Sequence, residues 1–182
     1  IPQFHTLTTR HLNRVFDNTV ATYKYYWFLG ILDACVKQGK SRINVWDIMI
    51  SMVTNAWYPV NYFRLSFGKS ESLYDAILTL QREYNIQINI GINELTELLQ
   101  TLIQHREVRK LLNFLQQNVP FRFLRPWIDT SDDRQTVLRS QTFENGCLYK
   151  LERIDHIWWI ELNPAWLPYL RENYDILTSF VY

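Results

Sequence analysis

Apolar side chains recur every three or four residues through most of the first two thirds of the chain, which is the period of an α-helix. The clearest stripe lies within residues 21–38 and consists of Tyr25, Phe28, Leu29, Leu32 and Val36. Gly39 follows directly, and glycine is common just beyond a helix C-terminus. We therefore predict a helix over 21–38 that ends at Gly39. Because further aromatic residues widen the stripe, we expect this helix to be buried on most sides.

A second helix is predicted between Asn44 and Pro59. The Asn44 side chain can accept a backbone N–H of the first turn, and Asp47 places a carboxylate near the positive end of the helix. Pro59 should end the helix, because proline lacks the backbone N–H and its ring clashes with the preceding turn. Residues 60–70 then alternate apolar and polar side chains, which is typical of a short strand or an irregular arm.

Three more segments of the first 118 residues show the helical period. They begin at Thr8 or Thr9, at Ser70 or Ser72, and at Asn93. The last of them continues in two stretches to Asn118, and residues 85–91 before it favour an extended chain. Up to this point the sequence predicts almost only helix.

The pattern changes after residue 118. Two prolines and a cluster of Asp and Ser within 119–133 disfavour a continuous helix. Residues 147–162 are rich in aromatic and β-branched side chains and follow a Glu-Asn-Gly turn signal, so we predict a small β-hairpin or sheet near residues 143–162. Asn163 and Pro164 then open a final helix that shows no stop signal.

Together these elements predict a mainly α fold, a helical bundle with a small β element. We expect one compact module over residues 1–182, in which residues 1–118 form a helical region and residues 119–182 form a mixed α/β region. The chain has ample material for a core, since 47% of its residues are hydrophobic and 15% aromatic. The final helix is apolar to its last residue, so we also expect the chain to be a fragment of a longer protein.

Composition and charge bear on the function only by excluding some classes of protein. The 19 basic and 18 acidic residues give a net charge of +1, so overall basicity does not argue for nucleic-acid binding, although 1–80 and 105–153 each hold an excess of basic residues. No run is apolar enough to predict a membrane span. Cys35 and Cys147 form no CxxC pair, and Cys35 lies on an apolar helical face. We expect Cys35 to be a buried thiol and the compartment to be reducing and cytoplasmic.

Motifs of catalysis and cofactor binding are missing from the sequence. It contains no glycine-rich phosphate loop and no G-x-S-x-G, and His5, His11 and His105 have no metal-ligand spacing. Asp155-His156 is the most tempting pair, because an Asp-His pair opens many HNH nuclease metal sites. The proline and the third ligand of that motif do not follow, so we interpret the pair as belonging to a surface strand and predict no metal site.

Basic residues interleaved with aromatic ones are the remaining signal. Three clusters stand out: Lys37, Lys40 and Arg42; Arg64 and Lys69 around Phe67; and Arg122 and Arg125 beside Phe123 and Trp127. Such residues can neutralise phosphates and stack on exposed bases. The alternative interpretation is that the charges solvate loops while the aromatic residues belong to the core.

Four blocks carry a resemblance to a known family. They are "FDNTVATYKYYWFLGILD", "NAWYPVNYFRLSFG", "VPFRFLRPWI" and "LNPAWLPYL", and their order spans most of the chain. In these blocks the sequence resembles the region upstream of the nuclease domain in bacterial HNH endonuclease-domain proteins. The resemblance implies a helical, winged-helix-like N-terminal module of a DNA-cutting hydrolase. The HNH motif itself is absent, so no catalytic residue is transferred, no cofactor is expected in this segment, and a divalent metal is expected only in a downstream nuclease domain.

Two functions of different class follow from these observations. The first is a DNA-recognition or DNA-positioning module, inert on its own, that contacts DNA through the basic residues of the three clusters. The second is a protein-interaction or oligomerisation domain without nucleic-acid binding, in which the apolar C-terminal helix mediates self-association. A stand-alone enzyme is the third alternative.

Overall fold

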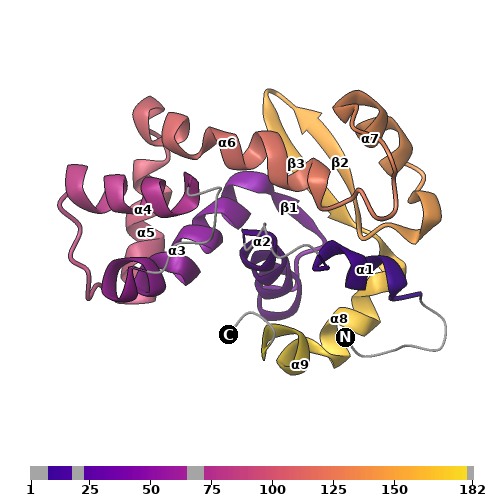
Figure 1. Cartoon of the computed structure of the whole chain (residues 1–182), viewed down its shortest axis with the longest axis horizontal. Helices are drawn as coiled ribbons and strands as arrows, with labels where there is room; N and C mark the ends of the chain where they lie inside the picture. Colours follow the sequence, from indigo (N-terminus) through magenta and orange to yellow (C-terminus); the bar gives the residue numbers. More distant parts are fainter. Residues whose placement is uncertain (1–7, 18–22, 65–71, 180–182) are drawn as a thin grey trace.

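The computed structural model describes residues 8–17, 23–64 and 72–179, and it is built mainly from helices (Figure 1). The helices are α1 (Arg10–Val15), α2 (Tyr23–Leu32), α3 (Val45–Phe63), α4 (Ser72–Glu83), α5 (Ile92–Leu102), α6 (Arg106–Arg122), α7 (Asp133–Ser140), α8 (Leu167–Glu172) and α9 (Tyr174–Ser179). The π-helical turn η1 (Asp33–Lys37) extends α2, and two 3₁₀ turns are η2 (Glu144–Gly146) and η3 (Pro164–Trp166). The strands are β1 (Arg42–Asn44), β2 (Tyr149–Ile154) and β3 (Ile157–Leu162). The predicted mainly α fold with a small β element is confirmed.

The three strands form one antiparallel sheet in the order β1-β3-β2. The predicted hairpin is β2 and β3, joined by Asp155 and His156, which have φ of 51° and 66°. Two positive φ values are the mark of a type I′ turn, and Asp and His tolerate this conformation better than most residues. The Asp-His pair is therefore the turn of the hairpin and does not belong to a strand.

Strand β1 was not predicted, because the polar segment before Asn44 is typical of a turn. Ile43 pairs with Ile160 of β3, and its burial fixes the register. Asn44 then caps α3 as predicted: its side chain accepts the Trp46 N–H at 2.9 Å. One strand of the sheet thus lies inside the region of the chain for which almost only helix was expected.

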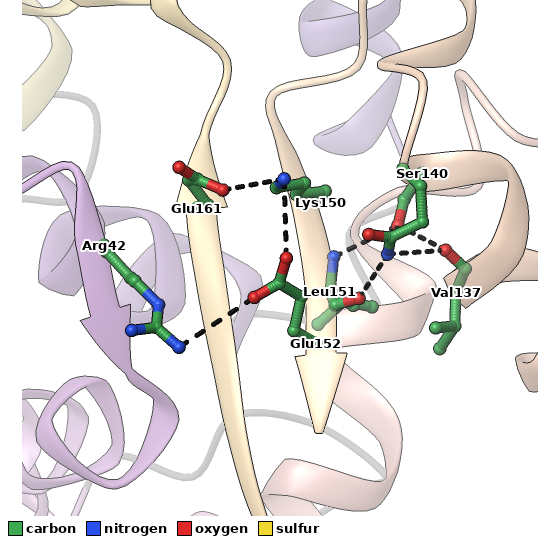
Figure 2. A network of polar contacts seen from close by, with 8 residues as sticks. Arg42, Val137, Ser140, Lys150, Leu151, Glu152 and Glu161 are labelled. Atoms are coloured by element: carbon green, nitrogen blue, oxygen red, sulfur yellow. Dashed lines mark hydrogen bonds and ion pairs between the residues drawn. The ribbon is translucent and has the colours of Figure 1, made fainter. Parts of the chain in front are cut away.

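The outer edge of β2 is covered by α7, a helix that the sequence analysis missed. The Leu151 N–H donates to Ser140 Oγ at 3.1 Å, and Gln141 Nε2 donates to the Leu151 carbonyl at 2.6 Å (Figure 2). These side chains satisfy backbone groups that an edge strand leaves open. Asp132 caps α7 by accepting the Arg134 N–H at 2.9 Å.

Helix α2 lies at the centre of the molecule, with α3 and α6 packed against it (Figure 1). Trp27, fully buried, meets Tyr149 of β2 edge-to-face with 6.2 Å between ring centroids, and Phe28 stacks on Phe123 at 5.9 Å. One apolar cluster therefore joins the helical region to the mixed region. The prediction that the helix within 21–38 is buried on most sides is confirmed, and Gly39, with φ of 65°, follows its π-helical extension.

The prediction that Pro59 ends its helix was wrong, whereas no continuous helix runs through 119–133, as expected. Pro59 lies inside α3, which continues to Phe63, and Pro120 lies inside α6, which continues to Arg122. Val60 is buried beyond Pro59, so the packing of this face outweighs the hydrogen bond that the proline cannot donate. Beyond Pro120 the last turn of α6 is tied to the sheet, since the Tyr149 hydroxyl donates to the Pro120 carbonyl at 2.6 Å.

Smaller differences concern element boundaries. Helix α5 begins at Ile92 with Gly91 as its N-cap residue, not at Asn93, and residues 85–91 form no strand but mix turns with extended backbone such as that of Gly91. The final helix is interrupted at Asn173, although Asn163 caps its entry by accepting the Ala165 N–H at 3.1 Å. The arm predicted over 60–70 is helical to residue 63, and residues 65–71 lie outside the described residues, as does the side chain of Ser72.

Both cysteines are buried and free. Burial raises the pKa of the Cys147 thiol to about 12 and also raises the pKa of Cys35. The expectation of a buried Cys35 thiol is confirmed, and neither group has the lowered pKa of a reactive cysteine.

Candidate functional site

Lys37 lies in the π-helical turn η1, with partners from two elements. Its Nζ is 3.5 Å from Asp33 Oδ1 and 5.7 Å from the centre of the Tyr174 ring, and the Tyr174 hydroxyl donates to the same Asp33 oxygen at 2.7 Å. Tyr174 and Asp33 raise the pKa of Lys37, so its ammonium is held charged. π-Helical turns are rare and frequent at functional sites. The triad of Asp33, Lys37 and Tyr174 therefore connects α9 to the π-helical turn that extends α2.

The triad lines a polar cleft of about 540 Å³ between η1, α3, α5 and α9. Lys40 and Asp47 also line it, with amide and hydroxyl groups around them. The cleft walls withdraw the Asp47 carboxylate partly from water and raise its pKa, while the charge of Lys40 opposes the rise. The cleft holds cations and carboxylates in equal measure, which suits a polar ligand without strong net charge better than a phosphate backbone.

Arg42 lies on the outer face of the sheet, away from the cleft. Its guanidinium is 4.7 Å from the centre of the Trp159 ring and 3.9 Å from Glu152. Lys150 links Glu152 at 3.4 Å to Glu161 at 2.8 Å (Figure 2). The first predicted cluster is thus divided between two sites, and each of its three cations has a carboxylate near it.

Only part of the second predicted cluster lies within the described residues. Arg64 is exposed and ends α3 in the left-handed conformation with φ of 51°, where its N–H bonds to the Val60 carbonyl at 3.0 Å. Lys69 and Phe67 lie outside the described residues. Arg64 is therefore the single exposed cation of this cluster among the residues that the structure describes.

The third predicted cluster gains a cation that the sequence analysis did not include. Lys24, Arg122 and Arg125 lie together where α1, the start of α2 and the end of α6 meet, and we call them the Arg122 cluster. Arg122 Nη1 donates to the Tyr23 hydroxyl at 3.3 Å, and Lys24 Nζ donates to the Val15 carbonyl at 3.5 Å. Burial, with the charges of Arg125 and Arg122, lowers the pKa of Lys24.

None of these three cations forms an ion pair within the portion of the chain that the structure describes. The aromatic residues expected beside them do not share their surface, because Phe123 and Trp127 are core residues. The Arg122 cluster can therefore attract an anion, but it offers no ring from this pair for stacking. Lys24 could not be assigned from sequence, since about a hundred residues separate it from Arg122.

A further concave surface was missed altogether. It is a groove of about 880 Å³ between α6, α7 and the turn end of the β2–β3 hairpin, and we call it the amide groove. Asn113, Gln116 and Gln117 supply its amides, and Phe121 and Trp158 supply its rings. The Trp158-Trp159 dipeptide was the available signal, since neighbouring residues of a strand point to opposite faces of the sheet.

The described residues contain neither a candidate metal site nor a candidate membrane-spanning helix. No group of three or more His, Cys, Asp or Glu side chains in that portion of the chain could hold a metal ion, and Asp155 and His156 are exposed on the hairpin turn. No described helix combines the length and the apolar character needed to cross a bilayer.

Comparison with known proteins yields no relative. No family model, no curated protein and no solved structure matches this chain. The resemblance to HNH endonuclease-domain proteins thus stays a prediction, and the function has to be argued from the sites themselves.

Proposed function

We propose that this chain is a non-catalytic DNA-binding module and that the Arg122 cluster is its phosphate contact. The observation that carries the proposal is the gathering of three cations from distant segments of the chain without a carboxylate partner among the described residues. Partial burial of a lysine beside two arginines costs free energy in the unliganded protein. A bound phosphate would offset that cost, because it supplies the missing opposite charge.

The cations of the first predicted cluster are weaker candidates for a phosphate contact. Lys37, Lys40 and Arg42 each lie near a carboxylate, so a phosphate would have to compete with Asp33, Asp47 or Glu152. Lys24 and Lys37 also lie thirteen residues apart on α2 and its extension, which is about 20 Å at 1.5 Å per residue. We therefore assign the principal contact to the Arg122 cluster and treat the first predicted cluster as secondary.

The resemblance extends the proposal to the parent protein. A winged-helix-like module upstream of an HNH nuclease domain would position DNA for cleavage. The divalent metal would bind in that downstream domain, and the present segment would supply binding alone.

Duplex DNA binding, measured by fluorescence anisotropy over a series of salt concentrations, tests the phosphate contact. Replacing Arg122 and Arg125 with Ala should reduce the slope of log K against log [salt] by about 1.8, since each lost phosphate contact removes about 0.9. The matched control replaces Arg106 and Arg109, exposed residues of the first turn of α6, and removes the same charge. Equal slopes for the two double variants would contradict the assignment.

A protein-interaction or oligomerisation domain is the second candidate. It is favoured by large apolar side chains left in solvent, among them Ile176 on α9, which is 52% exposed, and Phe63 at the end of α3, which is 73% exposed. Exposed apolar residues are common singly and gain meaning as a patch. A mass that rises with protein concentration in sedimentation, together with no DNA binding at low salt, would select this function.

A further inference from the structure

The amide groove presents planar side chains at its hairpin end. The Arg153 guanidinium lies 5.6 Å from the centre of the Trp158 ring, which meets Phe121 edge-to-face at 5.2 Å and 88°. Arg153 is exposed and Trp158 is only partly buried. Indole rings and guanidinium planes are the surfaces on which unpaired bases stack in single-stranded nucleic acids.

Helix α6 lines the groove with hydrogen-bonding groups. Asn113, Gln116 and Gln117 are carboxamides, which carry both donors and acceptors and so match the mixed donor and acceptor edge of a base. Gln116 uses one donor to bond the Asn113 side-chain oxygen. The exposed Gln117 amide has no protein hydrogen-bond partner among the described residues.

The charge of the groove favours an anionic ligand. Arg134 and Arg153 line it, and Asp133 is the one acid among its described lining residues. Leu138, 63% exposed, adds an apolar wall opposite the α6 amides. The volume of about 880 Å³ lies within the roughly 300–1,000 Å³ common for ligand sites.

The walls are held in place before any ligand binds. Helix α7 is fixed to the edge of β2 by the hydrogen bonds between Leu151 and the Ser140 and Gln141 side chains (Figure 2). Phe121 of the groove and Arg122 of the cluster both belong to the last turn of α6, although their side chains have different partners, Trp158 and Tyr23.

We propose that the amide groove binds an unpaired base of single-stranded nucleic acid. The base lies against Trp158 and Arg153, its edge faces the α6 amides, and Arg134 contacts the neighbouring phosphate. This inference rests on the proposed function, because it names the form of nucleic acid that the module binds. An apolar peptide segment is the competing occupant, and the two arginines and three amides favour the nucleic acid over it.

The test compares two probes of equal length and charge, a short oligothymidylate and its abasic analogue. Stacking requires the base, whereas phosphate contacts do not, so the intact protein should bind the base-bearing strand about fivefold to a hundredfold more tightly. Trp158→Ala should bring this ratio close to one. The matched control is Trp159→Ala, because Trp159 is adjacent in sequence, lies on the opposite face of the sheet and also has an arginine over its ring.

A second variant guards against loss of folding in Trp158→Ala. Leu138→Glu changes an exposed wall residue and puts a carboxylate into the groove, so it should weaken oligothymidylate binding without weakening duplex binding at the Arg122 cluster. Ile176→Glu is its control, an exposed apolar residue on α9. Circular dichroism verifies the fold of each variant.

The outcomes separate this inference from the proposed function. A binding ratio near one in the unmodified protein, or equal ratios for Trp158→Ala and Trp159→Ala, overturns the base-binding groove. The same result is expected if the groove binds a peptide. Neither result contradicts duplex DNA binding at the Arg122 cluster. Failure of both oligonucleotides and of duplex DNA to bind at low salt overturns the proposed function and this inference together.

Discussion

Lys24 is the residue at which stability and proposed function conflict most clearly. It is partly buried beside Arg122 and Arg125, and burial with these charges lowers its pKa. A lysine whose pKa is lower in the folded than in the unfolded state destabilises the fold while it is protonated. The hydrogen bond from Lys24 to the Val15 carbonyl is long, at 3.5 Å, so it offsets little of this destabilisation. We interpret Lys24 as a residue whose charge serves anion binding at the expense of stability.

Lys24→Met should therefore raise the free energy of unfolding at pH 7, by roughly 0.5–1 kcal/mol. At Lys24 the unfolded chain binds more protons than the folded one between the lowered pKa and 10.5, so the unfavourable contribution of this residue shrinks as pH rises across that window. The advantage of Lys24→Met should shrink accordingly in urea titrations at increasing pH. Lys110→Met, an exposed position on α6, is the control and should show neither effect.

At the scale of elements, the contact between α2 and α3 depends on Gly30. A Cβ at this position would lie 2.9 Å from Ile48 Cγ2 and 3.4 Å from the Ile48 carbonyl oxygen. Such distances mean that the two helices approach closely because the glycine has no side chain. Helix propensity alone favours Ala over Gly by up to about 1 kcal/mol, so packing and propensity make opposite predictions here.

We expect Gly30→Ala to lower the free energy of unfolding by about 1–3 kcal/mol, since overpacking at a helix contact costs more than propensity returns. Chemical denaturation followed by circular dichroism measures the change. Gly91→Ala is the control without a steric clash, because a Cβ at that position meets no atom within 4 Å, and it should show only the cost of replacing the N-cap glycine of α5. A Gly30→Ala protein at least as stable as the unmodified one would show that the steric cost at this contact is no larger than the gain in helix propensity.

At the scale of the molecule, one apolar cluster crosses the boundary between the helical and the mixed region. Trp27 of α2, Phe123 after α6 and Tyr149 of β2 are all fully buried in it. The sheet crosses the boundary too, because β1 belongs to the helical region and pairs with β3. Neither region can therefore open without exposing the core of the other.

The expected consequence is a single cooperative unfolding transition. Helix content by circular dichroism, tryptophan fluorescence and reaction of the Cys147 thiol with a thiol reagent should give coincident denaturation curves. The thiol serves as a probe of the mixed region because it is buried and its pKa is raised to about 12 in the folded protein. Thiol exposure at a lower denaturant concentration than loss of helix would mean that the mixed region unfolds separately.

Much of the fold could be predicted from local pattern. The α2 stripe, the Asn44 and Asn163 caps and the β2–β3 hairpin each depend on residues close in sequence, and all were predicted. Strand β1 and helix α7 were missed because both are short and polar. Strand β1 is stabilised by pairing with β3, and α7 by side-chain hydrogen bonds to the Leu151 backbone at the edge of β2. Local propensity carries no information about such partners.

The sequence by itself determined the mainly α architecture, the central buried helix and the hairpin, because periodicity and capping act over a few residues. Only the tertiary structure decided that Arg122 and Arg125 are joined by Lys24, that Arg42 lies on the sheet rather than beside Lys37, and that Trp158 lines a groove with the α6 amides. The reason is physical: a binding surface collects side chains from elements far apart in the chain, and their relative positions are set by the packing of the core.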